Sequence, residues 1–270
     1  MYAVASGVSV GALFLAGIIP AFILTTILCA FVFLDARRNK ARDESAASNA
    51  AVGEAVGAAL PVLATPVIIL GGILGGVFTP TEAAAAAVLY VLLLCVFYRS
   101  LSLKQFYGVL VQTTQTTGSI MLIVSAAGLF GWVIANEQGP QIVTNALLEI
   151  VDKDNPYMFL LLINIALLVT GMLLEPVAGL LITVPVVLPA AAEFGIDPLQ
   201  LGIVMILNLV LGLLTPPVGL VLYVLSSVTG SPVQRVIKGT VPFLIPLLMT
   251  LLLITFVPAF SLWLPSLVGR

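Results

Sequence analysis

The sequence predicts an all-α protein that crosses a membrane several times. Of its 270 residues, 61% are hydrophobic and only 8% are charged, whereas a soluble domain carries about 25% charged residues. The apolar residues gather in runs long enough to cross the roughly 30 Å hydrocarbon core of a bilayer. Because backbone groups in lipid must pair within their own segment, we expect these runs to be helices.

Composition also excludes several classes of function. The chain has no histidine, so a histidine base, metal ligand or proton relay is impossible. Cys29 and Cys95 lie inside apolar runs and are expected to be small buried hydrophobic residues. The sequence has no cluster of basic residues of the kind that would suggest a nucleic-acid partner. The acids inside apolar runs are single, whereas a membrane enzyme needs clustered acids or a nucleophile with its base. We therefore expect no enzymatic activity.

The first predicted elements are a membrane helix and a charged connector. Residues 1–34 end in a long apolar run and are interpreted as the last helix of a first repeat. Residues 35–58 follow, and their stretch DARRNKAR holds four of the ten lysines and arginines. The positive-inside rule places this connector in the cytoplasm.

Residues 59–104 are predicted to form a pair of scaffold helices separated by the sequence FTPTE. Thr79 is expected to be the N-cap of the second helix, with Pro80 at its first position. Glu82 stands where a capping box needs an acid or amide. We therefore interpret Glu82 as a structural cap residue.

Residues 105–230 are predicted to form a transport domain that opens with a re-entrant helical hairpin over 107–150. The stretch VQTTQTTGS is too polar to face lipid, and the chain becomes polar again at NEQGP. We expect the hairpin to dip into the membrane, with its tip near residues 125–128. Its threonines and glutamines either face a wet cavity or bond to neighbouring helices.

Two overlong apolar blocks complete the transport domain. As straight helices at 1.5 Å per residue, residues 157–192 and 199–229 would be roughly 54 and 46 Å long. GMLLEP and GLLTPP interrupt them, each with glycine first and proline after. Because glycine often ends a helix and proline begins one, each block is predicted to be a broken helix. The alternative is a kink without function, since both residues are common in membrane helices.

The two breaks predict a cation site inside the membrane. Ends of half-helices expose carbonyl oxygens that bind co-transported ions, and Gly171 and Gly212 mark two such ends. Thr215 is expected to cap the next half-helix, with a hydroxyl that also suits a hard cation such as Na⁺. Pro176 and Pro216 are expected to begin the half-helices that follow.

Substrate-contacting candidates lie at the two breaks and at the predicted hairpin tip. Glu175 is the only acid between Asp154 and Glu193, and an acid inside a membrane span suggests a functional site. Alternatively, Glu175 is an acid at a helix N-terminus, exposed in a polar crevice. The other candidates lie at the predicted hairpin tip and the second break: Ser125, Ala126, Gly128 and Pro216.

A weak internal repeat relates the two ends of the chain. The stretch SVGALFLAGIIP begins at Ser9, and SPVQRVIKGTVP begins at Ser231. Ser9, Gly17 and Pro20 of the first stretch recur at identical spacing as Ser231, Gly239 and Pro242 of the second. Basic residues follow the first helix, whereas Arg235 and Lys238 precede the second. The positive-inside rule then orients the two copies oppositely, as in the inverted repeats of transporters. Residues 231–270 are predicted to hold the final helix.

Together, these sequences resemble the large membrane subunit of tripartite ATP-independent periplasmic (TRAP) transporters. LFLAGIIP, GGILGGVFTPTEAAAAA, GMLLEPVAGLLITVPVVLPAAAEFGIDP, GLLTPPVGL and ITFVPAFSLWLP carry the resemblance over essentially the whole chain. It implies an elevator-type, Na⁺-driven importer of organic acids, such as C4-dicarboxylates or sialic acid, in a bacterial inner membrane. It also implies a small four-helix membrane subunit and a periplasmic binding protein as partners.

The resemblance further implies that backbone oxygens of Gly171, Gly212, Thr215 and Val218 bind one Na⁺. Val218 rests on the resemblance alone. Family members are typically longer, so the chain is expected to be a C-terminal portion whose missing N-terminal repeat comes from the same or another chain. Two alternatives are a divalent-anion/Na⁺ symporter without a binding protein and a non-transporting assembly subunit.

Overall fold

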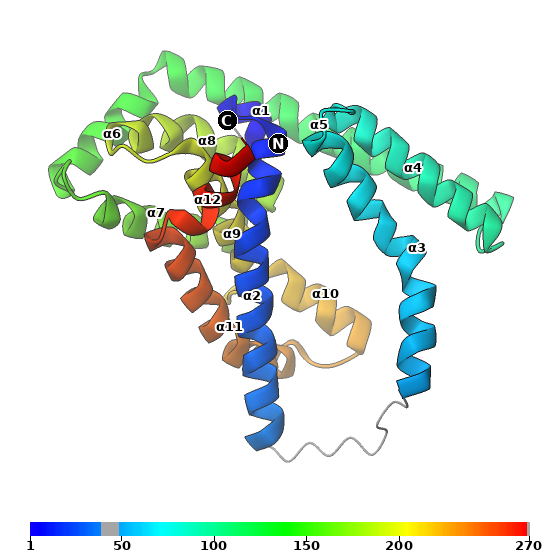
Figure 1. Ribbon diagram of the computed structural model, residues 1–270. Helices are drawn as coiled ribbons and strands as arrows, with labels where there is room; N and C mark the ends of the chain where they lie inside the picture. Colours follow the sequence, from blue (N-terminus) through cyan, green and yellow to red (C-terminus); the bar gives the residue numbers. More distant parts are fainter. Residues whose placement is uncertain (39–48, 269–270) are drawn as a thin grey trace. The chain divides into compact units, whose positions relative to one another are not determined.

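The computed structural model describes residues 1–38 and 49–268, with side chains over 1–37 and 59–268. This part of the chain contains twelve α-helices, labelled in Figure 1, and no β-strand. Six of the described helices are long and apolar enough to cross a membrane. The prediction of an all-α polytopic membrane protein is therefore confirmed.

The chain divides into two compact units. One unit comprises Met1–Arg37 with Leu122–Arg270, and the other comprises Arg38–Met121. The predicted connector is shorter than expected, because α2 (Val10–Arg38) and α3 (Asn49–Leu74) extend into it from both ends. The rest of that connector lies outside the described residues.

The smaller unit contains the predicted scaffold pair, α3 and α4 (Pro80–Phe97), which pack against one another. The Tyr90 hydroxyl donates to the Pro61 carbonyl at 2.7 Å and joins the two helices. The Glu82 N–H donates to the Thr79 hydroxyl at 3.3 Å, and the Glu82 carboxylate accepts the Thr79 N–H at 2.8 Å. The predicted capping box is therefore confirmed.

The segment predicted to be a hairpin folds differently. α5 (Leu103–Asn136) is one continuous helix, and α6 (Gly139–Ile150) follows after a turn at Glu137–Gln138. The predicted tip at residues 125–128 is therefore wrong, because these residues lie in the interior of α5. The boundary between the two units also falls within α5.

Helix propensities explain where the chain turns. Ala126 and Ala127 favour helix, and a single glycine such as Gly128 costs only about 1 kcal/mol in a helix interior. Gln138 instead takes a left-handed conformation with φ of 54°. Pro140 then stands in the first turn of α6, where its missing N–H is not needed.

The larger unit contains both predicted broken helices. The first consists of α7 (Pro156–Leu173) and α8 (Pro176–Glu193). The second consists of α9 (Pro198–Gly212) and α10 (Leu220–Thr229). Three of these half-helices begin at a proline, and Pro176 is the one that we expect from the sequence. Both interruptions are therefore real breaks in the helices.

The predicted final helix is two helices. α11 (Val233–Phe256) is followed by α12 (Ala259–Val268). The prediction of one continuous helix is wrong because Pro258 has no N–H to continue the hydrogen-bond ladder. Val257 at the junction takes φ of −119° and ψ of 88°, outside the helical region.

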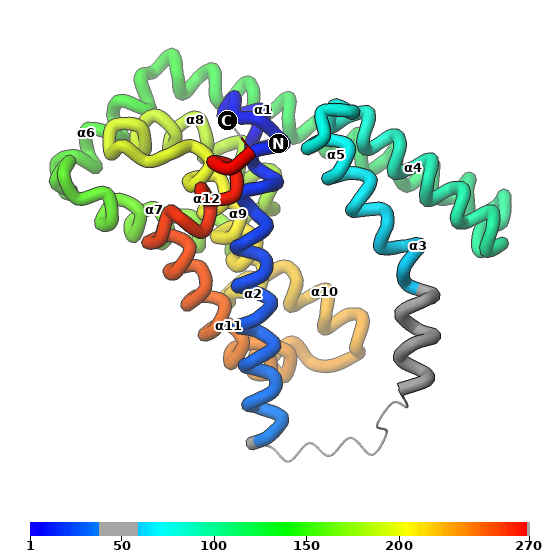
Figure 2. Tube along the Cα trace, in the orientation of Figure 1, coloured from blue at the N-terminus to red at the C-terminus, as the bar shows by residue number. Residues whose placement is uncertain are grey.

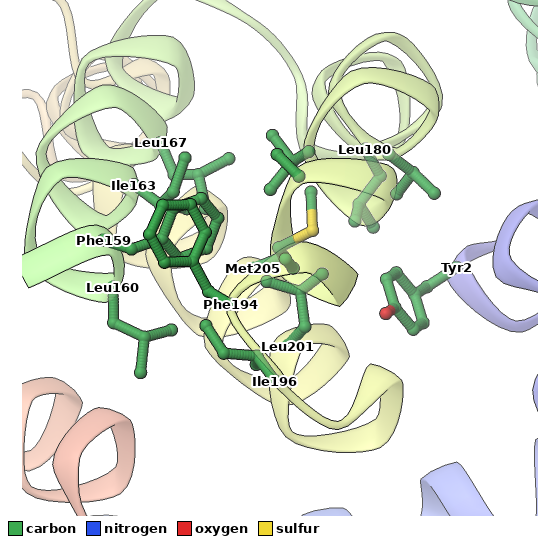
Figure 3. Packing of buried hydrophobic residues seen from close by; sticks show 14 of the residues in the cluster. Tyr2, Phe159, Leu160, Ile163, Leu167, Leu180, Phe194, Ile196, Leu201 and Met205 are labelled. Carbon is green, nitrogen blue, oxygen red and sulfur yellow. The ribbon is translucent and has the colours of Figure 1, made fainter. Parts of the chain in front are cut away.

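α9 lies at the centre of the larger unit and contacts α7, α8, α11 and α12. Figure 3 shows the apolar cluster around it, in which Leu201 and Met205 of α9 are completely buried. The rings of Phe159 and Phe194 stack with their centroids 4.5 Å apart. This packing holds the two broken helices against one another.

The first and last long helices of this unit, α2 and α11, run in opposite directions (Figure 2). Phe31 in the C-terminal half of α2 meets Phe243 in the N-terminal half of α11, with ring centroids 5.3 Å apart. Ala16 near the start of α2 shares an apolar cluster with Ile254 near the end of α11. The opposite orientation predicted for the two related segments is present in the structure.

Candidate functional site

The two broken helices meet at Gly171 of α7 and Gly212 of α9, both of which are buried. A Cβ added to Gly212 would lie 2.6 Å from the Cα of Gly171. A Cβ added to Gly171 would lie 2.8 Å from the Cα of Leu209. These separations are too short for any side chain, so glycine is required for the two backbones to touch here.

The first break leaves carbonyl oxygens without backbone partners. Leu174 and Glu175 are extended, with ψ of 150° and 140°. Pro176 has no N–H, so it cannot bond to the carbonyl one turn earlier. Over the described ranges, no backbone N–H is donated to the carbonyls of residues 171–173. Their oxygens are therefore available to another donor or to a cation.

Glu175 caps the half-helix that follows this break. Its carboxylate accepts the N–H of Val177 at 3.0 Å and the N–H of Ala178 at 3.1 Å. A negative charge is favourable there, because helix N-termini carry partial positive charge. The geometry thus agrees with the alternative of an exposed acid at a helix N-terminus. Substrate contact by Glu175 stays a prediction.

The second break is a loop over 213–219 that folds back on the end of α9. The Thr215 N–H donates to the Gly212 carbonyl at 3.0 Å, and its hydroxyl donates to the Leu211 carbonyl at 2.8 Å. The Val221 N–H donates to the Leu213 carbonyl at 3.3 Å and closes the loop. A carbonyl oxygen has two lone pairs, so the Gly212 oxygen keeps capacity for a further ligand.

Two predictions at this loop are wrong. Thr215 does not cap the next half-helix, and Pro216 does not begin it, because α10 begins at Leu220 with Gly219 as its N-cap. The physical reason is the second proline, since a residue that precedes proline is disfavoured in helical conformation. Gly219 takes a left-handed φ of 52° before the helix resumes.

The structure places the four candidate Na⁺ ligands at the end of α7, the end of α9 and the loop that follows α9. Gly171 and Gly212 touch, and Thr215 is bonded to the end of α9. Val218 lies in the same loop, where a Cβ added to Gly219 would come within 3.1 Å of the Thr215 carbonyl oxygen. The arrangement offers neutral carbonyl and hydroxyl oxygens, which are the ligands that hard cations prefer.

The candidate substrate residues lie in two places. Glu175 and Pro216 are at the two breaks. The remaining three, Ser125, Ala126 and Gly128, are in the interior of α5. They were expected at a hairpin tip, but α5 is continuous through these positions. α5 approaches α8 instead at Gly131, where an added Cβ would lie 3.6 Å from Pro185 Cγ.

Sequence reasoning missed a buried polar cluster beside the glycine contact. The Asn208 amide of α9 donates to the Asn164 carbonyl oxygen of α7 and, at 2.8 Å, to the Val204 carbonyl. The Asn164 amide donates to the Thr255 hydroxyl of α11 at 3.1 Å. The Gln200 amide donates to the Thr255 carbonyl at 2.9 Å. These side chains join three helices through the middle of the unit.

A signal for this cluster is visible in the sequence. Asn164 precedes Gly171 by seven residues and Asn208 precedes Gly212 by four, so each asparagine shares a helix face with its glycine. Asn208 is completely buried, and its side-chain oxygen has no hydrogen-bond partner among the described residues. A lone asparagine in an apolar run is therefore a sign of a buried interhelical contact.

Comparison with known proteins places the chain among transporter permeases. Residues 1–260 match the family model described as "Tripartite ATP-independent periplasmic transporter, DctM component". The sialic acid TRAP transporter large permease protein SiaM of Vibrio cholerae is 42% identical over 99% of this chain and 62% of its own length. The C4-dicarboxylate TRAP transporter large permease protein DctM of Pseudomonas aeruginosa is 42% identical over 100% of this chain and 63% of its own length.

A third relative extends the range of named substrates. The ectoine/5-hydroxyectoine TRAP transporter large permease protein UehC of Ruegeria pomeroyi is 36% identical over 99% of this chain and 62% of its own length. The chain therefore spans somewhat less than two thirds of the length of these relatives. All three relatives are named as permeases, which agrees with the expectation that the chain is not an enzyme.

Proposed function

Because the chain belongs to the DctM-component family of tripartite ATP-independent periplasmic transporters, we propose that it forms part of a Na⁺-driven importer of organic acids. It is an inner-membrane protein, as the family and the six membrane-length helices indicate. The observation that carries the proposal is the contact between Gly171 and Gly212, where two helices break inside membrane-length apolar segments.

The broken helices support coupling to a small cation. Hydrogen bonds left open in hydrocarbon cost several kcal/mol each, so such breaks persist where they are buried or bind something. The carbonyl oxygens at residues 171–173 have no backbone donor in the described part of the chain. Together with Gly212, Thr215 and Val218, they supply the kind of oxygen ligands that Na⁺ binds.

The proposed cargo is an organic acid with a carboxylate group. Two of the three relatives are named for carboxylates, sialic acid and C4-dicarboxylates. We propose Glu175, Pro216 and the small residues of α5, Ser125, Ala126 and Gly128, as the first positions to test for contact with it. The partners proposed from the family are a small four-helix membrane subunit and a periplasmic binding protein.

The division of the chain supports an elevator mechanism. Both broken helices lie in the larger unit, and the predicted scaffold pair lies in the smaller one. In the proposal, the part that carries the breaks moves across the membrane against the scaffold pair. The family assignment argues against the alternative of a symporter without a binding protein.

Uptake measurements test this proposal. The chain is reconstituted in liposomes with the proposed small subunit and binding protein, and with the additional permease segment that the longer relatives contain. Radiolabelled sialic acid and a C4-dicarboxylate are supplied outside, under a gradient of Na⁺ or of K⁺. We expect uptake of an organic acid only with Na⁺, and loss of uptake for Gly212→Leu. Equal uptake in Na⁺-free buffer would exclude Na⁺ coupling, and no uptake of any acid would favour a non-transporting assembly subunit.

A further inference from the structure

A pocket of about 470 Å³ opens between α10 and α11, away from the two breaks. Its lining combines apolar side chains with polar ones: Leu225, Val236, Phe243, Thr229, Ser231, Arg235, Gly239 and Thr240. Neither the transport site nor the polar cluster uses these residues. The pocket is therefore a separate feature of the larger unit.

Two hydrogen-bond donors in the pocket have no side-chain partner among the described residues. The Thr229 hydroxyl donates to the Leu225 carbonyl at 2.8 Å, and the Thr240 hydroxyl donates to the Val236 carbonyl at 3.0 Å. In the described ranges, neither the Arg235 guanidinium nor the Ser231 hydroxyl has a side-chain partner. A guanidinium beside a hydroxyl is well suited to the oxygens of a phosphate.

Charge at this end of the unit also favours an anion. No acidic residue follows Asp197 in the sequence, so α9 to α12 carry no negative side chain. The contact of Phe31 with Phe243 places the C-terminal end of α2 beside the pocket. That end adds one acid, Asp35, and two bases, Arg37 and Arg38, so with Arg235 and Lys238 the charge here is positive. The positive-inside rule assigns this end to the cytoplasmic surface.

The apolar wall of the pocket indicates an amphiphilic ligand. Val236 is 8% exposed, and Leu225 and Phe243 complete an apolar surface next to the charged rim. A Cβ added to Gly239 would meet no atom within 4 Å, so the glycine leaves space along α11. A small hydrophilic acid would leave this wall exposed, whereas an acyl chain would cover it.

We propose that this pocket binds the headgroup of an anionic phospholipid from the cytoplasmic leaflet. The phosphate lies against Arg235 and Ser231, and an acyl chain lies along Leu225 and Phe243. Basic pockets between membrane helices on the cytoplasmic side are a known mode of anionic lipid recognition. The proposal does not depend on which substrate the transporter carries.

Native mass spectrometry of the purified full chain in detergent tests the proposal. The chain is mixed with phosphatidylglycerol, phosphatidylcholine or excess inorganic phosphate, and retained lipid is counted. We expect preferential retention of phosphatidylglycerol. Arg235→Gln should lower its retention about fivefold, since a basic residue near an anionic surface contributes about 1 kcal/mol. Lys238→Gln is the matched control, because Lys238 carries the same charge outside the pocket lining and should have a smaller effect.

Gly239→Leu provides a second test that leaves every charge in place. The new side chain fills the pocket, and leucine favours helix more than glycine does, so the chain should fold with unchanged helix content. We expect retention of phosphatidylglycerol to fall as much as in Arg235→Gln. Equal retention of both lipids by the unmodified chain, equal losses in Arg235→Gln and Lys238→Gln, or displacement by inorganic phosphate would each overturn the proposal.

Discussion

Gly171 and Gly212 leave no room between them for a methyl group, because a Cβ on Gly212 would lie 2.6 Å from the Gly171 Cα. α7 and α9 therefore touch backbone to backbone at their broken ends. The open carbonyls of residues 171–173 and the loop at 213–219 both begin at this contact. The geometry of the proposed cation site depends on this contact.

Gly212→Ala is expected to destabilise the protein by about 1–3 kcal/mol, because an extra methyl group in a close-packed contact forces backbone shifts. Unfolding of the purified chain in detergent measures the effect. Gly118→Ala is the control, since a Cβ there would meet no atom within 4 Å. Equal stability of the two variants would show that the helices do not touch at Gly212.

Asn164→Leu should cost about 1–3 kcal/mol, because it removes the acceptor for the Asn208 amide and the donor to Thr255. Thr170→Val is the control, since its hydroxyl bonds only within its own helix, to the Ala166 carbonyl at 2.8 Å. A double-mutant cycle with Asn208→Leu gives the interaction directly. Strictly additive losses in that cycle would contradict a direct Asn164–Asn208 bond.

Glu175→Leu should lose about 1 kcal/mol of stability, because the cap on two N–H groups of α8 disappears. Glu175→Asn should keep nearly full stability, since asparagine is a strong N-cap without charge. Thermal unfolding of both variants measures the difference. If Glu175→Asn were as unstable as Glu175→Leu, capping would not be the structural role of this residue.

Tyr2 gives a pH-dependent test of the contact between α1 (Tyr2–Ser6) and α9. Its hydroxyl donates to the Pro198 carbonyl at 2.5 Å, and burial raises its pKa to about 12. Because this folded value exceeds the ordinary value of about 10, the stability that Tyr2 contributes is complete below pH 10. It is lost as the pH rises towards 12.

Thermal unfolding between pH 9 and pH 12 should therefore show a fall in stability that Tyr2→Phe lacks. The variant loses the hydrogen bond at every pH, so its melting temperature should be lower but less dependent on pH over this range. An equal fall for both proteins would assign the pH effect to other groups.

Local signals predicted the start of α4 and both breaks. Thr79 and Glu82 form a capping box from residues three apart, so no tertiary information is needed to recognise it. Each break is indicated by a glycine and a proline that lie within six residues of one another, inside an apolar block longer than one membrane span needs. These features depend on backbone chemistry alone, which is why the sequence predicts them.

The errors arose where two local signals competed or where packing decided. Small residues at 125–128 were interpreted as a turn, although alanines favour helix and the polar residues at 137–138 turn the chain. At the second break, the paired prolines delay the next helix to Leu220. The bonds between Asn164, Asn208 and Thr255 link residues up to 91 positions apart, so a local pattern marks the two asparagines as polar residues in apolar runs but does not identify their partners.

The central claim is that the two breaks form a Na⁺ site. The most direct test is to measure how cations change the stability of the purified chain and of the assembled transporter. A ligand at 100 times its dissociation constant stabilises a folded protein by about 2.7 kcal/mol. We therefore expect Na⁺, but not K⁺ or choline, to raise the melting temperature, and Thr215→Val to abolish that rise while Thr170→Val retains it. Identical melting temperatures in Na⁺ and choline, in the chain and in the assembly alike, would contradict a Na⁺ site at the two breaks.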